Sequence, residues 1–394
     1  MSTVSIIIPV RNRARFIRGA IESALIQTHR DCEVIVVDDG STDGTRDILE
    51  YYRSRITVVK QAEANQAVAL NRALARATGR IIAFLDSDDL MPADRIGRSL
   101  SSMGLADVLV HPMEAIDDNG EPLNVLVGPP PWLFSGGHPV RLFERNYLSR
   151  IQCLFRRDVL GPAPFNEQLP MCQDYALYLE LVRREANFRY VPYSLYLYRI
   201  HEGNISKARD VAREVEGSIL RGISLGEVEH LYASAGLDEA TVVFGLAMVV
   251  LRRGEYDAAE KMFEEANRKR GGSDAHSLFY MAVLDMAAGR AARAEWLLTT
   301  CRQLDSEEPT IQNNLGVLHA LRGDLASALK LFSQALRALP AYLDAKSNLT
   351  LLRSNGDFSE LRFTPALLKR ELIVNMPARP QAKNQSPIAA RAAA

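Results

Sequence analysis

The sequence has little cysteine and no long apolar run. Four of its 394 residues are cysteine, and none has the spacing of a CxxC pair or a metal-ligand set: Cys32, Cys153, Cys172 and Cys301. This usage indicates free thiols in a reducing compartment. The longest apolar stretch, residues 241–251, is far shorter than the roughly 20 residues that cross a bilayer. We therefore expect no transmembrane segment and no signal peptide.

An excess of charge of one sign is also absent. Lysine and arginine number 47 against 48 for aspartate and glutamate, which gives a formal net charge of −1. This balance lacks the electrostatic footprint of a dedicated nucleic-acid-binding protein, so we expect no nucleic-acid partner. Hydrophobic residues make up 47% of the chain, as in an ordinary globular protein. At about 150 residues per domain, the length predicts two or three domains.

The first two hundred residues alternate between short apolar runs and helical patterns. Apolar runs predict strands at 4–10, 33–38, 56–60, 81–85, 151–155, 188–191 and 195–200. Helical spacing predicts helices at 16–27, 66–77 and 174–185, whereas the Pro/Gly-rich segment 120–137 is predicted to be a loop. This order predicts an α/β domain with a mostly parallel sheet covered on both faces. In such sheets ligands bind at the carboxyl ends of the strands.

Beyond residue 236 the strand pattern ends and a repeat begins. Gly254, Gly289 and Gly323 lie 35 and 34 residues apart. The same offsets connect three further sets of residues: Ala247, Ala282 and Gly316; Ala259, Ala294 and Ala328; Phe263, Leu298 and Phe332. A period near 34 is typical of stacked helical hairpins, and the last copy resembles the tetratricopeptide family. We predict a helical linker at 207–235, an all-α tetratricopeptide-like repeat domain at 236–356, and a C-terminal extension at 357–394 that is disordered at its end.

Two acidic clusters directly follow predicted strands. The first is Asp38-Asp39-Gly40-Ser41, where a carboxylate can accept hydrogen bonds from the ring N–H or ribose hydroxyl of a ligand. The second is Asp86-Ser87-Asp88-Asp89, where carboxylates at i and i+2 can reach one Mg²⁺ or Mn²⁺ together. Taken alone, the first cluster is better explained as a turn in which Asp and Ser cap the next helix, and the Asp-x-Asp pattern of the second is weak. The position of the second cluster directly after a buried parallel strand favours a ligand site there.

Two further elements lie later in the same region. Asp174 opens a predicted helix and could act as a general base, although an acidic residue in a first helical turn is commonly no more than a favourable charge. The segment from Arg199 and His201 to Ser206 could bind a diphosphate or a metal, while a lone histidine near a loop is normally structural. The strands lack a GxGxxG, P-loop or GxSxG motif, which argues against dinucleotide oxidoreductases, P-loop kinases and α/β-hydrolases.

The order of these elements resembles the inverting family-2 glycosyltransferases of the GT-A fold. The resemblance covers about residues 3–206 and is carried by the following groups: SIIIPVRN from Ser5 to Asn12, VVDDGSTDGT from Val36 to Thr45, Gln66 to Asn71, Gly79, and FLDSDD from Phe84 to Asp89. It implies a GT-A nucleotide-sugar-binding domain at 1–206, followed by the all-α repeat domain. It also implies a hexosyltransferase-type enzyme that depends on Mg²⁺ or Mn²⁺.

The resemblance implies a role for each matching residue. Asp174 would be the catalytic base. Pro9, Arg11 and Asp39 would bind the nucleotide base of the nucleotide sugar. Asp86, Arg199 and Ser206 would bind it nearer the diphosphate. The metal would be held by Asp88 and His201. Three positions depart from the family pattern: Gln173 replaces the usual Glu before the base, Asn65 a common Gly, and Asn166 a common Asp. The first departure could alter activity.

The resemblance implies that Asp174 removes the proton of an acceptor hydroxyl while the sugar leaves its nucleoside diphosphate with inversion. We expect a UDP-sugar as donor and a glycan, lipid carrier or protein as acceptor, with the repeats recruiting a protein partner. The expected location is cytoplasmic, either free or peripheral at the inner face of the membrane. Two alternatives stay open. One is a weakly active or inactive transferase-like scaffold that binds partners through its repeats. The other is a nucleotidyltransferase, although the sequence from Arg11 to Arg15 supplies charge without the expected glycines.

Overall fold

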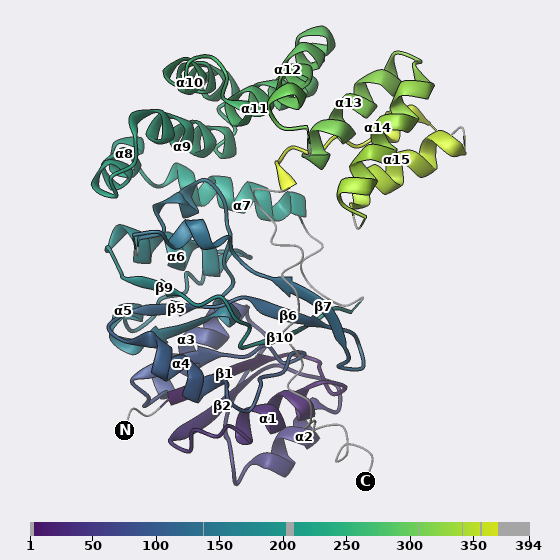
Figure 1. Ribbon diagram of the computed structural model, residues 1–394. Helices are drawn as coiled ribbons and strands as arrows, with labels where there is room; N and C mark the ends of the chain where they lie inside the picture. Colours follow the sequence, from purple (N-terminus) through teal and green to yellow (C-terminus); the bar gives the residue numbers. More distant parts are fainter. Residues whose placement is uncertain are drawn as a thin grey trace.

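A computed structural model of the protein describes residues 4–136, 138–201, 209–306, 308–340, 342–354 and 357–368 (Figure 1). A domain built on β-sheets forms the lower part of the view, and an arc of paired helices lies above it. The elements of the sheet domain come first along the chain and the paired helices follow, in the order that the sequence predicts.

The main sheet contains seven strands: β1 (Val4–Val10), β2 (Cys32–Asp39), β3 (Thr57–Gln61), β4 (Ile81–Phe84), β5 (Val108–Val110), β8 (Cys153–Arg156) and β9 (Phe188–Tyr190). Their order is β3-β2-β1-β4-β8-β5-β9. The pairs β1–β2, β1–β4, β2–β3 and β5–β9 are parallel, and β8 runs antiparallel to both of its neighbours. The mostly parallel sheet confirms the predicted fold class.

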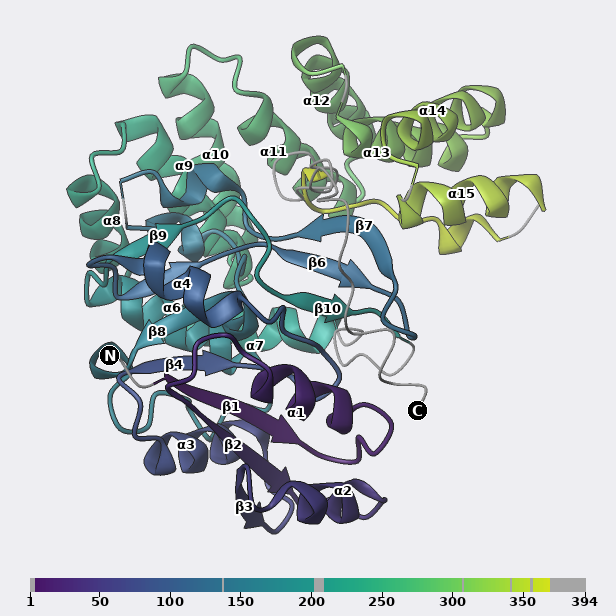
Figure 2. The same ribbon diagram turned by 60° about the horizontal axis from the view of Figure 1, so that its bottom comes forward.

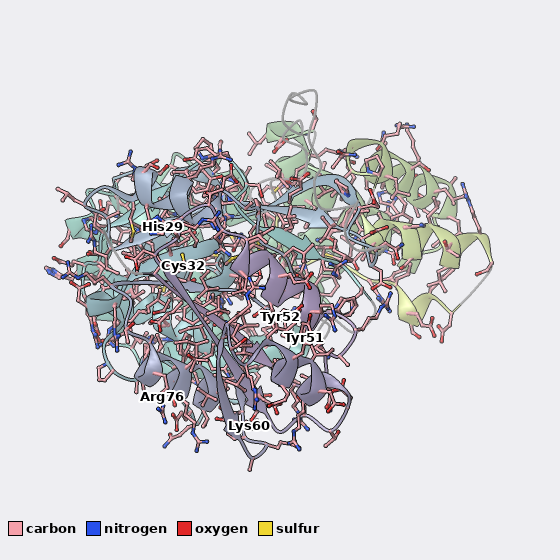
Figure 3. The ribbon with its side chains drawn as sticks, turned by 90° about the horizontal axis from the view of Figure 1, so that it is seen from below. His29, Cys32, Tyr51, Tyr52, Lys60 and Arg76 are labelled. Carbon is pink, nitrogen blue, oxygen red and sulfur yellow. The ribbon has the colours of Figure 1, made fainter. Side chains whose placement is uncertain are left out.

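Helices are interspersed with these strands: α1 (Ile17–Leu25), α2 (Thr45–Tyr52), α3 (Gln66–Arg76), α4 (Arg95–Met103), α5 (Arg157–Leu160) and α6 (Gln173–Arg183). Every residue of β1 is buried, as expected for a central strand with both faces covered. Gln27 fastens α1 to α4, since its amide donates to the Pro92 carbonyl at 2.8 Å and accepts from the Ile96 N–H at 3.1 Å. Figure 3 shows Tyr51 and Tyr52 together at the end of α2, where Tyr52 donates a hydrogen bond to Glu22 of α1.

A second, smaller sheet lies beside the main one. It consists of β6 (Met113–Ile116), β7 (Pro122–Val127) and β10 (Leu197–Arg199) in the order β10-β6-β7. The prediction of a loop over residues 120–137 was therefore wrong for its first part, because β7 pairs antiparallel with β6. The side chains of β7 are exposed or half-buried, so this edge strand lacks the apolar run by which buried strands are identified.

Nine α-helices follow in the described part of the chain: α7 (Arg209–Arg221), α8 (Leu225–Ser234), α9 (Glu239–Arg252), α10 (Tyr256–Lys269), α11 (Ala275–Ala287), α12 (Ala291–Leu304), α13 (Pro309–Leu321), α14 (Leu325–Ala338) and α15 (Leu343–Arg353). The pairs α9–α10, α11–α12 and α13–α14 are helical hairpins (Figure 2). Gly254, Gly289 and Gly323 lie in their turns with φ of +85°, +73° and +88°, a conformation that glycine adopts without strain.

The small residues of the repeat lie where two helices meet. A Cβ on Gly316 in α13 would lie only 2.6 Å from the Phe332 ring in α14. Ala328 and Phe332 are themselves fully buried. The helices can therefore approach this closely only with a small residue on α13, which is the physical reason for the repeating pattern.

The first repeat helices share a core with the sheet domain. Tyr232 of α8 and Val249 of α9 belong to the same buried apolar cluster as the strands. Arg252 at the end of α9 donates to the Phe143 carbonyl at 3.1 Å and to the Tyr175 hydroxyl at 2.5 Å. The helical array therefore begins as a packed extension of the sheet domain.

The lengths of the helices and the state of the cysteines bear on two further expectations. Within the described ranges, no helix combines the length and the apolar character needed to cross a bilayer. The four cysteines are free. Cys32 lies near His29 (Figure 3), and its thiol donates to the His29 carbonyl at 3.3 Å.

Candidate active site

The parallel strands bring the predicted site residues to one edge of the main sheet. β1, β2 and β4 are parallel neighbours, so residues at or just after their carboxyl ends emerge at the same edge. These include Arg11 after β1, Asp39 at the end of β2 and Asp86 after β4.

Asp39 is 7% exposed and holds the loop that follows β3. Its Oδ1 accepts hydrogen bonds from Gln61 Nε2 at 2.6 Å and from the Ala64 N–H at 2.9 Å. The next residue, Gly40, has φ of +75°, and a Cβ there would lie 2.8 Å from the nitrogen of Glu63. Because glycine alone permits this close approach, the Asp-Asp-Gly sequence fixes the shape of this corner.

Pro9 and Arg11 lie at the same corner. Pro9 is in register with Val37 of β2, two residues before Asp39. Arg11 forms an ion pair with Glu63 at 2.6 Å, in which both side chains are well exposed to solvent. Arg11 and Asp39 thus contact the loop that follows β3, and Pro9 lies on the neighbouring strand β1. The contact of these three residues with a nucleotide stays a prediction.

Asp89, the last aspartate after β4, is fully engaged inside the protein. It is 2% exposed. It accepts hydrogen bonds from the Tyr196 hydroxyl at 2.8 Å and from the Arg199 N–H at 2.7 Å. Both donors come from the segment around β10, so Asp89 joins the loop after β4 to the small sheet. It does not face the site.

Asp88 instead meets two side chains that could contact a ligand. Its Oδ2 lies 3.0 Å from His201 Nε2 and 3.5 Å from Arg13 Nε. Phe16 packs against the imidazole with ring centroids 5.0 Å apart. A carboxylate, an imidazole and a guanidinium from three separate segments therefore converge at this point.

Arg150 connects Asp86 with Asp174. Its Nη2 donates to Asp86 Oδ1, and its Nη1 donates to Asp174 Oδ1 at 3.3 Å and Oδ2 at 3.2 Å. The Arg150 N–H adds a hydrogen bond to Asp174 Oδ2 at 3.0 Å, and Ser149 Oγ donates to the same oxygen at 3.5 Å. Because Asp174 opens α6 and Asp86 follows β4, a single guanidinium holds two distant elements of the chain together.

The burial of this cluster shifts its ionisation. Burial raises the pKa of Asp86 to about 6, with Arg150 opposing the shift and the charges of Asp88 and Asp174 adding to it. Burial also raises the pKa of Asp89 well above its usual range, helped by the charges of Asp86 and Asp88. Although burial opposes it, the two carboxylates beside Arg150 raise the pKa of its guanidinium. Arg150 therefore stays charged and compensates the acidic cluster.

Arg199 is 7% exposed, and its guanidinium binds main-chain oxygens. It donates to the carbonyls of Asp88 at 2.7 Å, Asp117 at 3.0 Å and Asp118 at 2.9 Å. These bonds shape the loop that carries Asp88. The predicted contact of Arg199 with a diphosphate stays a prediction, and Ser206 lies outside the described residues.

Asp88 and His201 offer one carboxylate and one imidazole to a divalent cation. Their side chains are 15% and 9% exposed. In the part of the chain that the structure describes, no three His, Cys, Asp or Glu side chains converge as a ligand set. Mg²⁺ is usually held by one or two protein groups together with substrate phosphates. The pair therefore fits an ion shared with a diphosphate and does not fit a cage made by protein alone.

Comparisons with known proteins bear on the family to which the chain belongs. The family model "Glycosyl transferase family 2" matches residues 5–160, and a tetratricopeptide repeat model matches residues 310–338. The Escherichia coli protein WfaP, named a UDP-Glc:alpha-D-GlcNAc-diphosphoundecaprenol beta-1,3-glucosyltransferase, is 31% identical over 230 residues, which cover 57% of this chain and 88% of the relative. The chain belongs to glycosyl transferase family 2.

Other relatives match over shorter segments. The putative teichuronic acid biosynthesis glycosyltransferase TuaG of Bacillus subtilis is 48% identical over 104 residues, 25% of this chain and 41% of the relative. An uncharacterized glycosyltransferase of Nostoc is 38% identical over 127 residues, 31% of this chain and 39% of the relative. The chain thus spans about two fifths of the length of these two relatives. The solved structure of Staphylococcus aureus TarS 1–349 in complex with UDP-GlcNAc has a TM-score of 0.49 at 19% identity, covering 95% of this chain and 96% of TarS 1–349.

The three departures from the family-2 pattern lie in one region. Gln173 is buried and donates to the Leu169 carbonyl at 3.0 Å, a bond that a carboxylate could not donate. Asn65 caps α3 by accepting from the Val68 N–H, and it donates to the Glu167 carbonyl at 2.7 Å. These amides tie together the loop that precedes the base, so the departures adjust how this loop is held.

Sequence analysis missed the residues that connect the site. Arg150 and Arg13 contact the predicted acids, and Tyr196 donates to Asp89 and accepts from the Asp86 N–H at 3.0 Å. The nearest sequence signal for Arg150 was the capping box formed by Ser149 and Gln152 around it. That signal predicts a turn and carries no information on distant carboxylates.

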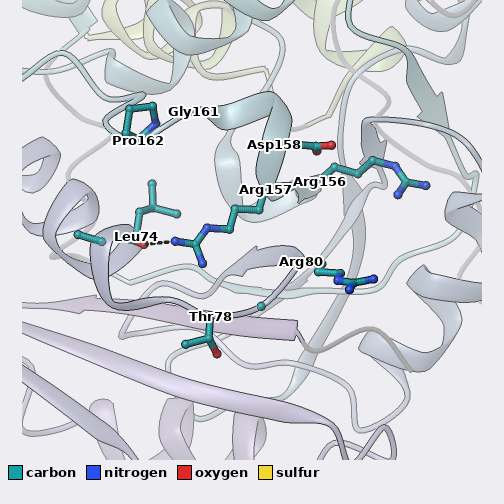
Figure 4. Close-up of a pocket in the computed structure, with 10 residues that line it drawn as sticks. Leu74, Thr78, Arg80, Arg156, Arg157, Asp158, Gly161 and Pro162 are labelled. Carbon is teal, nitrogen blue, oxygen red and sulfur yellow. Dashed lines mark hydrogen bonds between the residues drawn. The ribbon is translucent and has the colours of Figure 1, made fainter.

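A surface cavity of about 650 Å³ lies at the opposite edge of the main sheet. Figure 4 shows that Leu74, Arg80, Arg157 and Pro162 are among the residues that line it. Arg157 donates to the Leu74 carbonyl at 3.3 Å. Because Arg80 precedes β4 whereas the acids follow β4, this cavity is separate from the candidate active site.

Proposed function

We propose that the protein is an inverting glycosyltransferase that moves a sugar from a nucleoside-diphosphate sugar to an acceptor hydroxyl. Membership of glycosyl transferase family 2 supports the reaction class. The name of the Escherichia coli relative supports a UDP-sugar as donor and a lipid-linked glycan as acceptor. An acceptor on a lipid carrier would be met by a cytoplasmic protein at the inner face of the membrane.

The bridge made by Arg150 carries this proposal. It links Asp174, the proposed base, to Asp86 in the acidic element that follows β4. Two groups with different tasks, proton removal and donor binding, must lie at one place for a direct displacement. The side chain of Arg150 contacts both Asp174 and Asp86 and thereby holds these two groups close together.

In the proposed reaction Asp174 accepts the proton of the acceptor hydroxyl. The acceptor oxygen forms a bond to the anomeric carbon as the bond from that carbon to the diphosphate oxygen breaks. One displacement of this kind inverts the configuration, so an α-linked donor gives a β-linked product. The Arg150 N–H and Ser149 Oγ orient the carboxylate for this transfer.

Negative charge develops on the diphosphate as it leaves the sugar. A Mg²⁺ or Mn²⁺ held by Asp88 and His201 would neutralise part of this charge when bound. Arg13, 3.5 Å from Asp88, adds a cation from the chain itself. In this proposal Pro9, Arg11 and Asp39 hold the nucleotide, and Arg199 and Ser206 stand on the diphosphate side.

The experiment is a comparison of the wild type with Asp174→Asn. Release of UDP from a panel of UDP-sugars is measured with an α-GlcNAc-diphospholipid acceptor, and donor binding is measured by thermal shift with Mn²⁺. We expect Asp174→Asn to lower transfer about 100- to 10,000-fold while donor binding stays nearly unchanged. Asp158→Asn, at the start of α5 beside the opposite cavity, is the matched control. Full turnover by Asp174→Asn would remove this residue from the mechanism.

The same assay tests the second candidate function, a transferase-like scaffold with little or no activity. The buried amide of Gln173, where the family usually has a carboxylate, is the observation that favours it. A wild-type protein that binds a UDP-sugar but neither hydrolyses nor transfers it would support the scaffold. Transfer that is restored or raised in Gln173→Glu would assign the loss to this one position.

A further inference from the structure

Residues 361–368, called here the C-terminal segment, run back along the inner face of the last repeats. In Figures 1 and 2 this is the yellow stretch that turns back from α15 toward α13. The Arg362 carbonyl accepts from Asn348 Nδ2 at 2.7 Å and from Asn313 Nδ2 at 3.1 Å. The Arg362 N–H donates to Asn348 Oδ1 at 2.9 Å. The amide of Asn348 thus binds both backbone groups of one residue.

Thr364 is held in the same way by a second asparagine. Its N–H donates to Asn314 Oδ1 at 2.8 Å, and its carbonyl accepts from Asn314 Nδ2 at 2.9 Å. The N–H and carbonyl of one residue in an extended strand point to the same side, and those of the residue two positions on point the same way. Asn348 and Asn314 therefore bind the C-terminal segment as a neighbouring β-strand would.

The spacing of the two asparagines follows the repeat. Asn314 and Asn348 lie 34 residues apart, the same offset that separates Gly289 from Gly323. They occupy equivalent positions on α13 and α15, and both are buried, at 0% and 1% exposure. Asparagine is a poor helix former, so two of them at equivalent buried positions are explained by the backbone that they bind.

Side-chain contacts add a preference for particular residues. Thr364 Oγ1 donates to Asp344 Oδ2 at 2.6 Å and contacts the Tyr342 hydroxyl. Leu367 is 4% exposed and belongs to the apolar cluster formed by α9 to α14, against which Phe363 also packs. The pattern that fits is an aromatic residue, a threonine, and an aliphatic residue three positions later.

The C-terminal segment is partly buried and contributes apolar side chains to the core of the repeats. Within 361–368, Thr364 and Leu367 are buried and the other residues are half-buried or exposed. Leu361, Phe363 and Leu368 are half-buried and pack against the apolar clusters of the repeats, so a partner that displaces the segment must bury a comparable apolar surface. The groups that bind it contact mainly backbone, which every polypeptide carries.

We propose that the inner face of α13 and α15 is a binding site for an extended segment of a partner polypeptide, and that the C-terminal segment occupies this site until such a partner displaces it. The partner segment carries the Phe-Thr-x-x-Leu pattern of residues 363–367 or a close equivalent. A tethered occupant acts at an effective concentration in the mM range, so it weakens the apparent affinity for a partner. This proposal is independent of the glycosyltransferase activity.

The test uses the full chain and a fluorescent peptide with the sequence of residues 357–368 as probe. The C-terminal segment is weakened by the double substitution Phe363→Ala and Leu367→Ala. We expect this variant to bind the probe about tenfold or more tightly than the wild type, because the fraction of open sites rises. In the same background Asn314→Ala should abolish the gain, whereas Ser347→Ala, exposed on α15, should leave it unchanged. Fluorescence anisotropy measures each affinity.

A second probe keeps the test independent of the folding of the Asn314 variant. It carries an N-methyl group on the amide that corresponds to Thr364 and should bind at least tenfold more weakly. Equal binding of both probes, or equal binding by wild type and weakened variant, would overturn the proposal. It would also be overturned if the wild type is an oligomer that dissociates in the weakened variant, since the occupant would then come from a second copy.

Discussion

Replacing Arg150 with methionine tests whether one guanidinium holds the candidate active site together. Methionine keeps much of the side-chain length and removes the charge. Asp86 and Asp174 would then face each other across the site without the cation that both contact. We expect loss of stability together with loss of transfer.

The size of the stability loss follows from the exposure of the three groups. The Arg150 side chain is 6% exposed and that of Asp174 is 16% exposed, whereas Asp86 is 29% exposed and partly screened by water. Removing one partner of a buried ion pair costs about 3–5 kcal/mol, and the exposure of Asp86 favours the lower end. About 3 kcal/mol corresponds to a fall in Tm of about 6–12 °C for a domain of this size.

The assay is thermal and urea unfolding followed by circular dichroism, with Arg80→Met as the exposed control. The double variant Arg150→Met with Asp174→Asn should recover part of the stability, because it leaves one uncompensated carboxylate where the single variant leaves two. The reasoning would be refuted if Arg150→Met unfolds within about 1 kcal/mol of the wild type, or if the double variant is no more stable than the single one.

Three further predictions concern other parts of the molecule. Asp88→Ala should weaken the binding of UDP in the presence of Mn²⁺ about tenfold or more, as measured by calorimetry. If the affinity of the wild type for UDP is the same with and without a chelator, this would argue against a metal at Asp88. Burial lowers the pKa of His111 to about 3, so below pH 6.5 the unfolded chain takes up a proton that the folded chain does not. The free energy of unfolding should therefore fall as the pH is lowered from 6.5 toward 3, by up to about 1.4 kcal/mol per pH unit from this group. His111→Gln should remove that contribution, which urea titrations at several pH values measure. If the free energy of unfolding changes equally with pH in the wild type and in the variant, the assignment is contradicted. Gly316→Ala should destabilise by about 1–3 kcal/mol through overlap with Phe332, whereas Gly226→Ala, with open space around it in α8, should be neutral or stabilising. Equal effects of the two glycine changes would refute the packing explanation.

The repeat and the acidic clusters were predictable because their signals are local. Gly254, Gly289 and Gly323 mark the turns of the hairpins by their spacing alone. Asp39 and Asp86 could be placed at one sheet edge because buried parallel strands end there. The strand β7 escaped prediction because its side chains are exposed or half-buried, and a strand without an apolar run has no signal that separates it from a loop.

By itself, the sequence determined the fold class, the two-part organisation and the edge of the sheet where chemistry is expected, since periodicity and short motifs depend on neighbours along the chain. The tertiary structure alone decided that Arg150 joins Asp86 to Asp174 and that Asn314 binds the backbone of Thr364. These partners lie 24 to 64 residues apart in the chain. Contacts of this kind depend on how whole elements pack, and no local pattern of residues encodes which distant backbone or carboxylate a buried side chain will meet.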